Sequence, residues 1–227
     1  MYHKISPSIS EGLTISVHRL EAHFQYLSEK GYRSYHLSEL MDLQKLSSRK
    51  SVVITFDDGY VSQWEYAVPL LEKYELKATF FIPLKYVGAT DAWNEPSFPL
   101  MTTQQLKALN PNVVELGYHS FAHQKYDQLS LSEIEEDTAM AFETASQQEL
   151  SITATLAYPF GKFPRKHPEK EGFFQHLKAT QFVYGLRIGN RVNRFPFKHP
   201  YEINRIDVKG EYSLQKFKRK LKFGKLF

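Results

Sequence analysis

Short apolar runs alternate along the chain with amphipathic stretches, and this alternation limits the fold more than any other feature. The first four runs are almost continuously hydrophobic, which is typical of parallel strands covered on both faces. The stretches between them carry apolar residues at helical spacing. The pattern predicts an α/β fold with a mainly parallel sheet and right-handed crossovers. The expected strands are residues 52–56, 78–83, 113–118, 153–158, 182–186 and 203–208.

Three of the amphipathic stretches are clear helix candidates. The first ends before Gly31, and the third runs from Ile134 to Ala145. The second, residues 61–71, contains Pro69, which should kink or restart the helix because proline lacks the amide donor. Histidines on the predicted helix faces or in loops have no partner spacing, and we expect them to be solvated: His18, His23, His36, His167 and His176.

Length and composition narrow the class of protein. A chain of 227 residues can bury one substantial core, so residues 1–227 are expected to form a single domain. The sequence has no cysteine, which excludes disulfides, thiolate zinc sites and cysteine nucleophiles. Any metal must therefore be bound by histidine, aspartate or glutamate.

The formal net charge of +4 comes largely from the end of the chain. Residues 211–227 are expected to form a basic amphipathic helix, either a solvated terminal helix or one that makes weak contact with an anionic membrane surface or glycan. No aromatic platform for bases accompanies the charge, so nucleic acid is not an expected partner. The sequence contains no predicted transmembrane segment and no signal-like start, which favours a cytoplasmic protein.

Polar side chains follow three of the predicted strands directly. Asp57 and Asp58 lie in "TFDDGY", His119 and His123 in "HSFAH", and Pro159 begins "PFG". Because the carboxyl ends of parallel strands share one face, these segments should converge on one pocket.

The residue types in this pocket predict a catalytic metal site. Two histidines four residues apart can reach one ion if their segment forms a helical turn. Two histidines and one carboxylate, with a position left for water, are typical of catalytic zinc, although such ligands also accept cobalt or nickel. At the turn before Gly59, one of Asp57 and Asp58 can bind the metal while the other accepts a proton from water.

These motifs, together with "AVPLLEKYELKATFFIP" and "LAYPFGKF" in the same order, resemble the polysaccharide deacetylases of the NodB-homology type, carbohydrate esterase family 4. The resemblance implies a distorted (β/α) barrel and metal-dependent removal of acetyl groups from N-acetylated sugars in a glycan or glycan precursor. It implies that Asp57 is the catalytic base and that the metal ligands are Asp58, His119 and His123.

The third motif departs from the family pattern. Many members have an arginine two residues before its proline, in contact with the base, and here that position is Ala157. The resemblance implies that the backbone N–H near Phe160 stabilises the oxyanion, and it makes Tyr158 and Pro159 candidate substrate-binding residues. Proline and glycine also occupy their preferred places for a simple turn in this segment, and a turn is compatible with this role.

The late histidine that usually serves as general acid in this family is missing. His199 and His3 are the two candidates to replace it. In relatives an apolar strand leads into the element at Tyr2 and His3. Either this first barrel strand is lacking or the natural start lies upstream, in which case a lost leader would overturn the cytoplasmic expectation.

Three functions remain open at this point. The first is a metal-dependent N-deacetylase that uses metal-bound water as the nucleophile. The second, suggested by Ala157 and the missing acid, is a catalytically impaired glycan-binding or scaffold protein. The third is an O-acetyl esterase.

Overall fold

A curled parallel sheet of six strands forms the centre of the molecule. The computed structural model describes residues 1–225. In chain order the strands are β5 (Ile54–Asp57), β6 (Ala78–Ile82), β7 (Val114–Tyr118), β8 (Ile152–Ala157), β9 (Tyr184–Ile188) and β10 (Ile203–Arg205). They pair in the order β10-β9-β8-β7-β6-β5, and each of these pairs is parallel. The predicted parallel sheet is therefore confirmed.

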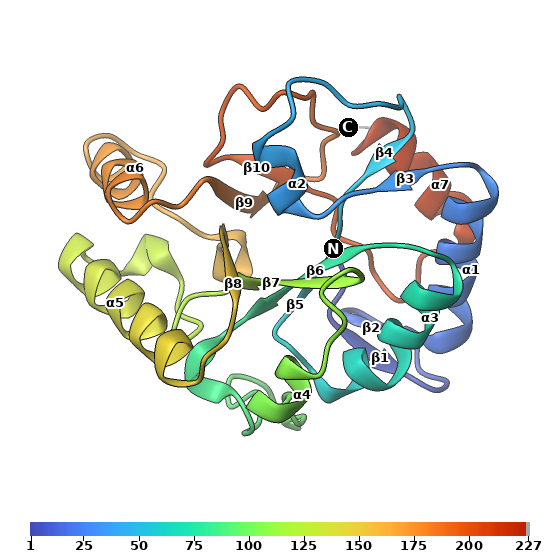
Figure 1. Ribbon diagram of the computed structural model, residues 1–227, viewed down its shortest axis with the longest axis horizontal. Helices are drawn as coiled ribbons and strands as arrows, with labels where there is room; N and C mark the ends of the chain where they lie inside the picture. The colour runs from blue at the N-terminus through green and yellow to red at the C-terminus, as the bar shows by residue number, and fades with distance from the viewer. Residues whose placement is uncertain (226–227) are drawn as a thin grey trace.

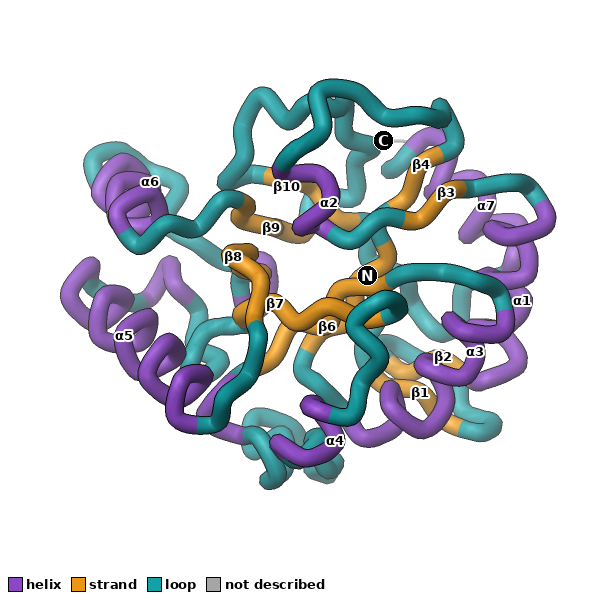
Figure 2. Tube along the Cα trace, in the orientation of Figure 1, coloured by secondary structure: helices purple, strands orange, loops and turns teal. Residues whose placement is uncertain are grey.

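Helices cover the outer side of the sheet and complete a half-barrel. In Figure 1 two of them, α5 and α6, lie to the left of the sheet, with α1, α3 and α7 to its right. Figure 2 shows the strands as an inner curve with the helices outside it. The α-helices are α1 (Val17–Glu29), α2 (Leu37–Met41), α3 (Val68–Lys73), α4 (Thr103–Lys107), α5 (Leu131–Gln147), α6 (Glu169–Ala179) and α7 (Leu214–Phe223).

Four short strands form two small parallel sheets beside the main one. They are β1 (Lys4–Ser6) paired with β2 (Thr14–Ser16), and β3 (Arg33–Ser34) paired with β4 (Ser51–Val52). The predicted strand 52–56 is thus divided between two sheets. Val52 pairs with Ser34, whereas Ile54 pairs with Ala78, so the chain changes partners at Val53.

The helix predicted over residues 61–71 is interrupted as expected. A π-helical turn, η1 (Gln63–Ala67), precedes α3, and Pro69 lies in the first turn of α3. A proline is tolerated there because the first amides of a helix have no intrahelical acceptor. The π turn contacts β1, and the side-chain amide of Gln63 donates to the carbonyl of Asp57 at the carboxyl end of β5.

The first residues of the chain lie alongside β5. The amide of Tyr2 donates to the carbonyl of Thr55, and the amide of Asp57 donates to the carbonyl of Tyr2. On the other side, the amide of Val208 donates to the carbonyl of Met1. Residues 1 and 2 therefore fill the space between β5 and the segment that follows β10, and they carry His3 to the end of β5.

Within the range 211–227 that was predicted as a basic helix, α7 covers Leu214–Phe223, and residues 226–227 lie outside the described residues. Its apolar side packs on α1, where the ring of Phe217 stacks on His23 at a centroid distance of 3.9 Å. The expectation that His23 is solvated is therefore wrong, and so are those for His36 and His176, because all three are buried. Each is hydrogen-bonded inside the protein, which offsets the cost of burial.

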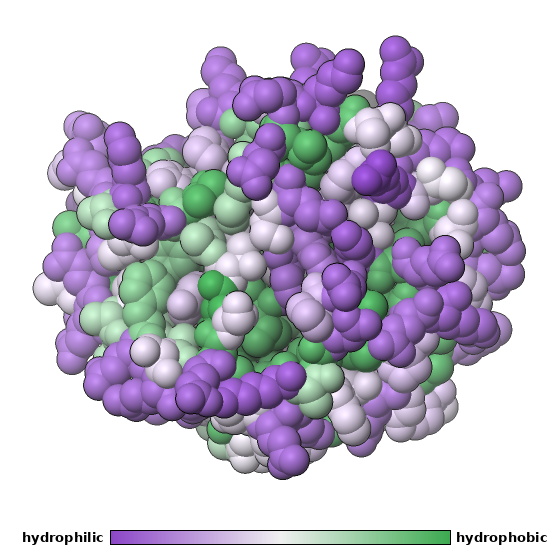
Figure 3. All heavy atoms as spheres, in the orientation of Figure 1, coloured by the Kyte–Doolittle hydropathy of each residue, from purple (hydrophilic) through white to green (hydrophobic). Residues whose placement is uncertain are grey.

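Surface composition varies from one region to another. Figure 3 shows apolar residues gathered between α5 and α6, where a core cluster that includes Tyr126, Phe173 and Phe182 lies under the two helices. Among residues 1–225, the helices are all too short or too polar to cross a membrane. Contact between α7 and an anionic surface stays a prediction.

Candidate metal and catalytic site

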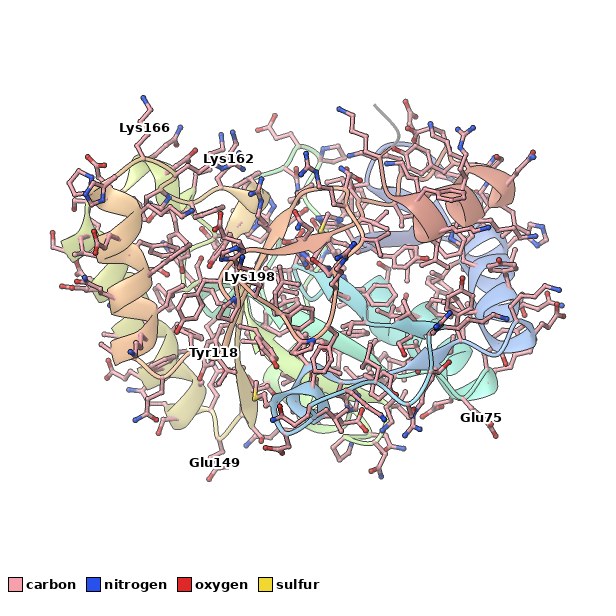
Figure 4. All side chains as sticks on the ribbon, turned by 90° about the horizontal axis from the view of Figure 1, so that it is seen from above. Glu75, Tyr118, Glu149, Lys162, Lys166 and Lys198 are labelled. Carbon is pink, nitrogen blue, oxygen red and sulfur yellow. The ribbon has the colours of Figure 1, made fainter. Side chains whose placement is uncertain are left out.

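The carboxyl ends of the strands gather the predicted polar residues at one edge of the molecule. Glu75 and Glu149, which precede β6 and β8, lie at the opposite edge from Lys162, which follows β8 (Figure 4). Asp58 follows β5, and His119 follows β7 directly. The expectation that strand ends converge is met by these segments.

Asp58, His119 and His123 are close enough to share one ion. The Nε2 atoms of His119 and His123 lie 3.4 and 3.2 Å from Oδ1 of Asp58. One ligand atom from each residue lies within 4.8 Å of the others, and all three residues are buried. Oδ1 of Asp58 is buried and accepts no hydrogen bond from any of residues 1–225. A buried, unsatisfied carboxylate oxygen facing two imidazoles fits a divalent cation bound by nitrogen and oxygen ligands.

The turn after β5 separates the two aspartates. Asp58 has φ 76° and Gly59 has φ 71°, so the strand alternation ends at Asp57. The positive φ of Gly59 favours glycine because a side chain is strained in this conformation, and a β-carbon there would also lie 2.9 Å from Cδ1 of Ile82. Both carboxylates can therefore approach the pocket from adjacent positions, as the sequence predicted.

The segment that carries the histidines is a loop, and the helical turn expected for the four-residue spacing is absent between His119 and His123. Ser120 and His123 instead have positive φ values of 63° and 55°. The loop is held by Asp137 of α5, whose carboxylate accepts hydrogen bonds from the amides of Phe121 and Ala122 at 2.9 and 3.0 Å. Sequence reasoning missed Asp137, which lies on the buried side of a predicted helix.

The tautomer of His119 suits metal binding. Nδ1 of His119 donates to the carbonyl of Ala157 at 2.7 Å, which leaves its Nε2 free to face Asp58. Burial lowers the pKa of His119, but the charges of Asp57 and Asp58 outweigh it and the pKa is raised. For His123 burial prevails and its pKa is lowered. Burial raises the pKa of Asp58, but the adjacent imidazoles of His119 and His123 outweigh it and hold the pKa well below its usual value.

Asp57 is paired with an arginine that the sequence analysis did not identify. Nη1 and Nη2 of Arg205, at the end of β10, donate to the two carboxylate oxygens at 2.5 and 2.8 Å. Burial raises the pKa of Asp57, but the charges of Arg205, His119 and His3 outweigh it and the pKa lies below its usual value. Arg205 thus makes the contact with Asp57 that the family resemblance led us to expect from an arginine at position 157. The only sequence signal was a basic residue inside the last predicted strand.

His3 is the second histidine beside Asp57. Its Nε2 lies 3.8 Å from Oδ2 of Asp57, and its ring is buried. Gln63 fixes this arrangement, because its side-chain amide donates to the carbonyls of both His3 and Asp57 at 3.0 and 2.6 Å. Of the two candidates for the general acid, His3 is therefore the one at the site.

His199 lies elsewhere. It is exposed in the loop before β10, beside Lys198, which is labelled in Figure 4, and it borders a small cavity lined by residues 192–204. Among residues 1–225, none of its contacts joins it to either aspartate. The prediction of His199 as the acid is therefore not supported, because its side chain is exposed and borders a different cavity.

The "YPFG" segment contributes less than predicted. The side chain of Tyr158 is fully buried among aromatic residues, and its hydroxyl donates to the carbonyl of Tyr201 at 2.8 Å. Its predicted role as a substrate-binding side chain is therefore corrected to a core role, and Pro159 is also buried. Phe160 has φ 57° and an exposed ring 4.8 Å from the ring of His123, so it borders the pocket.

Comparisons with known proteins show which sequences and folds this chain resembles. The family model described as polysaccharide deacetylase matches residues 44–171. YxkH of Bacillus subtilis, which carries the name of a polysaccharide deacetylase, is 28% identical over 179 residues, covering 76% of this chain and 61% of its own. The poly-beta-1,6-N-acetyl-D-glucosamine N-deacetylase of Staphylococcus aureus is 26% identical over 189 residues, covering 74% and 63%. The chain thus spans less than two thirds of either relative.

A solved structure shows the same fold over nearly the whole chain. The Streptococcus pyogenes deacetylase PplD superimposes with a TM-score of 0.80 at 20% identity, covering 97% of this chain and 96% of that one. At this identity the likeness establishes the half-barrel fold.

Proposed function

Because this chain belongs to the polysaccharide deacetylase family, we propose that it is a metal-dependent hydrolase that removes N-acetyl groups from amino sugars of a polysaccharide or glycan precursor. The observation that carries the proposal is that two adjacent carboxylates have different neighbours. Asp58 faces two imidazoles, whereas Asp57 faces a guanidinium and a third imidazole.

Asp58, His119 and His123 would bind one divalent cation, which we expect to be zinc, with cobalt or nickel as alternatives. A cation bound there supplies Lewis acidity, which polarises an acetyl carbonyl and lowers the pKa of water. The carbonyl of Ala157 keeps the His119 ring in the tautomer that such binding requires.

Asp57 accepts the proton of the attacking water in this proposal. The two hydrogen bonds from Arg205 fix both oxygens of its carboxylate. They also keep the carboxylate ionised, which a proton acceptor must be. The backbone N–H of Phe160, on the loop bordering His123, is the proposed donor to the oxyanion.

His3 is the proposed donor of the proton to the leaving nitrogen. When the C–N bond breaks, the amine needs a proton, and His3 lies beside the carboxylate that has just gained one. The pKa of His3 is lowered by burial, an effect that Asp57 and Asp58 partly offset. A lower pKa makes the protonated imidazole a stronger acid but reduces the fraction of His3 that is protonated, so this role depends on the proton that Asp57 gains.

The catalytically impaired alternative was suggested by Ala157 and by the missing late histidine. Arg205 contacts the carboxylate that an arginine at position 157 would reach, and His3 lies next to the same group. Both observations favour turnover. O-acetyl ester hydrolysis uses the same attack with an easier leaving group and stays a second enzymatic candidate.

Acetate release tests the proposal directly. The purified protein should release acetate from N-acetylglucosamine oligomers, peptidoglycan fragments or nucleotide sugars in repeated turnovers. A chelator should abolish the release, and added zinc or cobalt should restore it. Binding of these glycans without acetate release, at saturating metal, would instead favour the impaired protein.

A further inference from the structure

The two histidines of the candidate metal site are held in different ways. Nδ1 of His119 is fixed by the carbonyl of Ala157, the usual arrangement for a histidine ligand. Nδ1 of His123 is buried and has no hydrogen-bond partner among the described residues. Its backbone also has φ 55°, a conformation that costs free energy in a non-glycine residue. Something other than a hydrogen bond must orient this ring.

Trp93 supplies the contact. Its ring stacks on the ring of His123 with a centroid distance of 3.9 Å and an interplanar angle of 28°. Phe160 contacts the same imidazole at 4.8 Å, and Tyr86 packs edge-on against Trp93 at 4.9 Å. Contact with two aromatic rings restricts rotation of the imidazole as a hydrogen bond would.

The loop that carries Trp93 is built around a buried carboxylate. Asp91 is fully buried, and it accepts hydrogen bonds from the hydroxyl of Tyr60 and the side-chain amide of Asn94, both at 2.7 Å. It also accepts one from the amide of Phe98. Because the burial of a carboxylate is costly unless it is satisfied, this loop has one strongly preferred arrangement.

The same loop is attached to the turn that positions the other metal ligand. Tyr60 follows Gly59 directly, and the amide of Met101 donates to the carbonyl of Gly59 at 2.8 Å. The amide of Val61 donates to the carbonyl of Pro99 at 3.0 Å. The "DDGY" turn and the Trp93 loop therefore form one hydrogen-bonded unit on one side of His123.

We propose that Trp93 is a positioning residue for the metal site, which holds the His123 ring in its ligand orientation, and that the Asp91–Tyr60 pair holds Trp93 in place. The proposal rests on the proposed metal site at Asp58, His119 and His123. The stacked ring of Trp93 takes the place of the hydrogen bond that Nδ1 of His123 lacks.

Metal affinity measured by calorimetry, without substrate, tests the proposal. Trp93→Ala should bind zinc about 10-fold or more weakly than the wild type, the usual cost of losing a group that orients a ligand. Trp93→Phe should recover most of the affinity because it restores a stacked ring. Trp64→Ala, which removes the other tryptophan at an exposed position, is the matched control and should bind as the wild type does.

Tryptophan fluorescence gives a second measurement, because quenching by a bound metal depends on the distance between Trp93 and the metal and not on the stability of the fold. In Trp64→Phe, Trp93 is the single tryptophan, and its emission should be quenched when cobalt or nickel binds beside the stacked His123. His119→Ala should abolish the quenching together with the binding. Asp91→Asn should weaken both zinc affinity and quenching, which tests the support of the loop by a route that leaves Trp93 in place.

The outcomes separate this inference from the function on which it rests. If the wild type binds no metal, or if His119→Ala binds as tightly as the wild type, the proposed metal site fails. If the wild type binds zinc but Trp93→Ala and Asp91→Asn bind it equally well, the metal site stands and the role of Trp93 is overturned. Loss of affinity in Trp93→Ala that Trp93→Phe does not reverse also contradicts orientation by stacking.

Discussion

Arg205 and Asp57, which lie 148 residues apart in the sequence, form a two-point ion pair at the carboxyl ends of β10 and β5, the two outermost strands of the sheet. Both side chains are almost completely buried. Planar guanidinium and carboxylate groups match at two hydrogen bonds, which fixes the orientation as well as the charge of the base.

The first prediction concerns the geometry of this pair. Arg205→Lys keeps the positive charge but loses the second hydrogen bond, so the Asp57 carboxylate should be less well oriented. We expect kcat to fall by about 10- to 100-fold, a typical effect of small misplacement, while metal content is unchanged. Steady-state acetate release and metal analysis check this. Arg187→Lys, on the neighbouring strand β9, is the matched control and should keep full activity.

The second prediction concerns the stability that this pair contributes. Arg205→Met leaves the buried carboxylate of Asp57 unpaired, and it should lower the free energy of unfolding by about 3–5 kcal/mol. Urea denaturation at neutral pH measures the loss. Wild-type stability in this variant would show that Asp57 is satisfied by other groups.

The third prediction separates the two aspartates. Asp57→Asn should retain the metal, because it leaves the three ligands untouched, and lose about 100- to 10,000-fold in activity for want of a proton acceptor. Asp58→Asn should bind metal more weakly. Metal analysis and acetate release on both variants, with excess metal, decide the matter. Metal loss in Asp57→Asn alone would mean that the roles are reversed, and full turnover in Asp57→Asn would place the base elsewhere.

The sequence predicted those parts of the site that are local along the chain. The ligands follow buried strands directly, so a pattern of apolar runs was enough to bring Asp58 and His119 to one edge. Arg205 could not be found in this way, since its partner is determined by how far the sheet curls. Trp93 lies in a loop without apolar periodicity, and its stacking on His123 depends on the buried carboxylate of Asp91.

Histidine environments show the same limit. His23 lies on a helix, and whether it is buried depends on where α7 docks, which its own segment does not encode. His199 was a candidate acid because of its position late in the sequence, whereas His3 reaches the site through the pairing of Tyr2 with β5. Contacts of this kind join segments that are distant in the sequence, so the spacing of residues within one segment cannot predict them.

The fourth prediction follows from the burial of His23. Desolvation, with a further contribution from the charge of Arg19, lowers its pKa from 6.5 to about 3. Below about pH 6.5 the unfolded chain therefore binds a proton that the folded protein does not. The contribution of His23 to stability is fully present above that pH and decreases as the pH falls towards about 3.

Urea denaturation of metal-free protein at pH 7.5 and 5.5 checks this effect. The wild type should lose about 1–1.5 kcal/mol more between the two pH values than His23→Gln, in which this titration is absent. The comparison between the two proteins cancels the titration of the other histidines. Equal losses would mean that His23 is protonated in the folded state.

The last prediction tests His3 as the proton donor to the leaving amine. His3→Gln should reduce the rate of deacetylation of N-acetylglucosamine oligomers by about 100- to 10,000-fold, the usual contribution of a positioned acid. The defect should largely disappear with 4-nitrophenyl acetate, whose leaving group departs as a stable anion and needs no proton. His199→Gln is the control and should be fully active on both substrates. Equal defects on amide and ester, or loss of metal from His3→Gln, would show that His3 supports the site in another way and that the acid lies elsewhere.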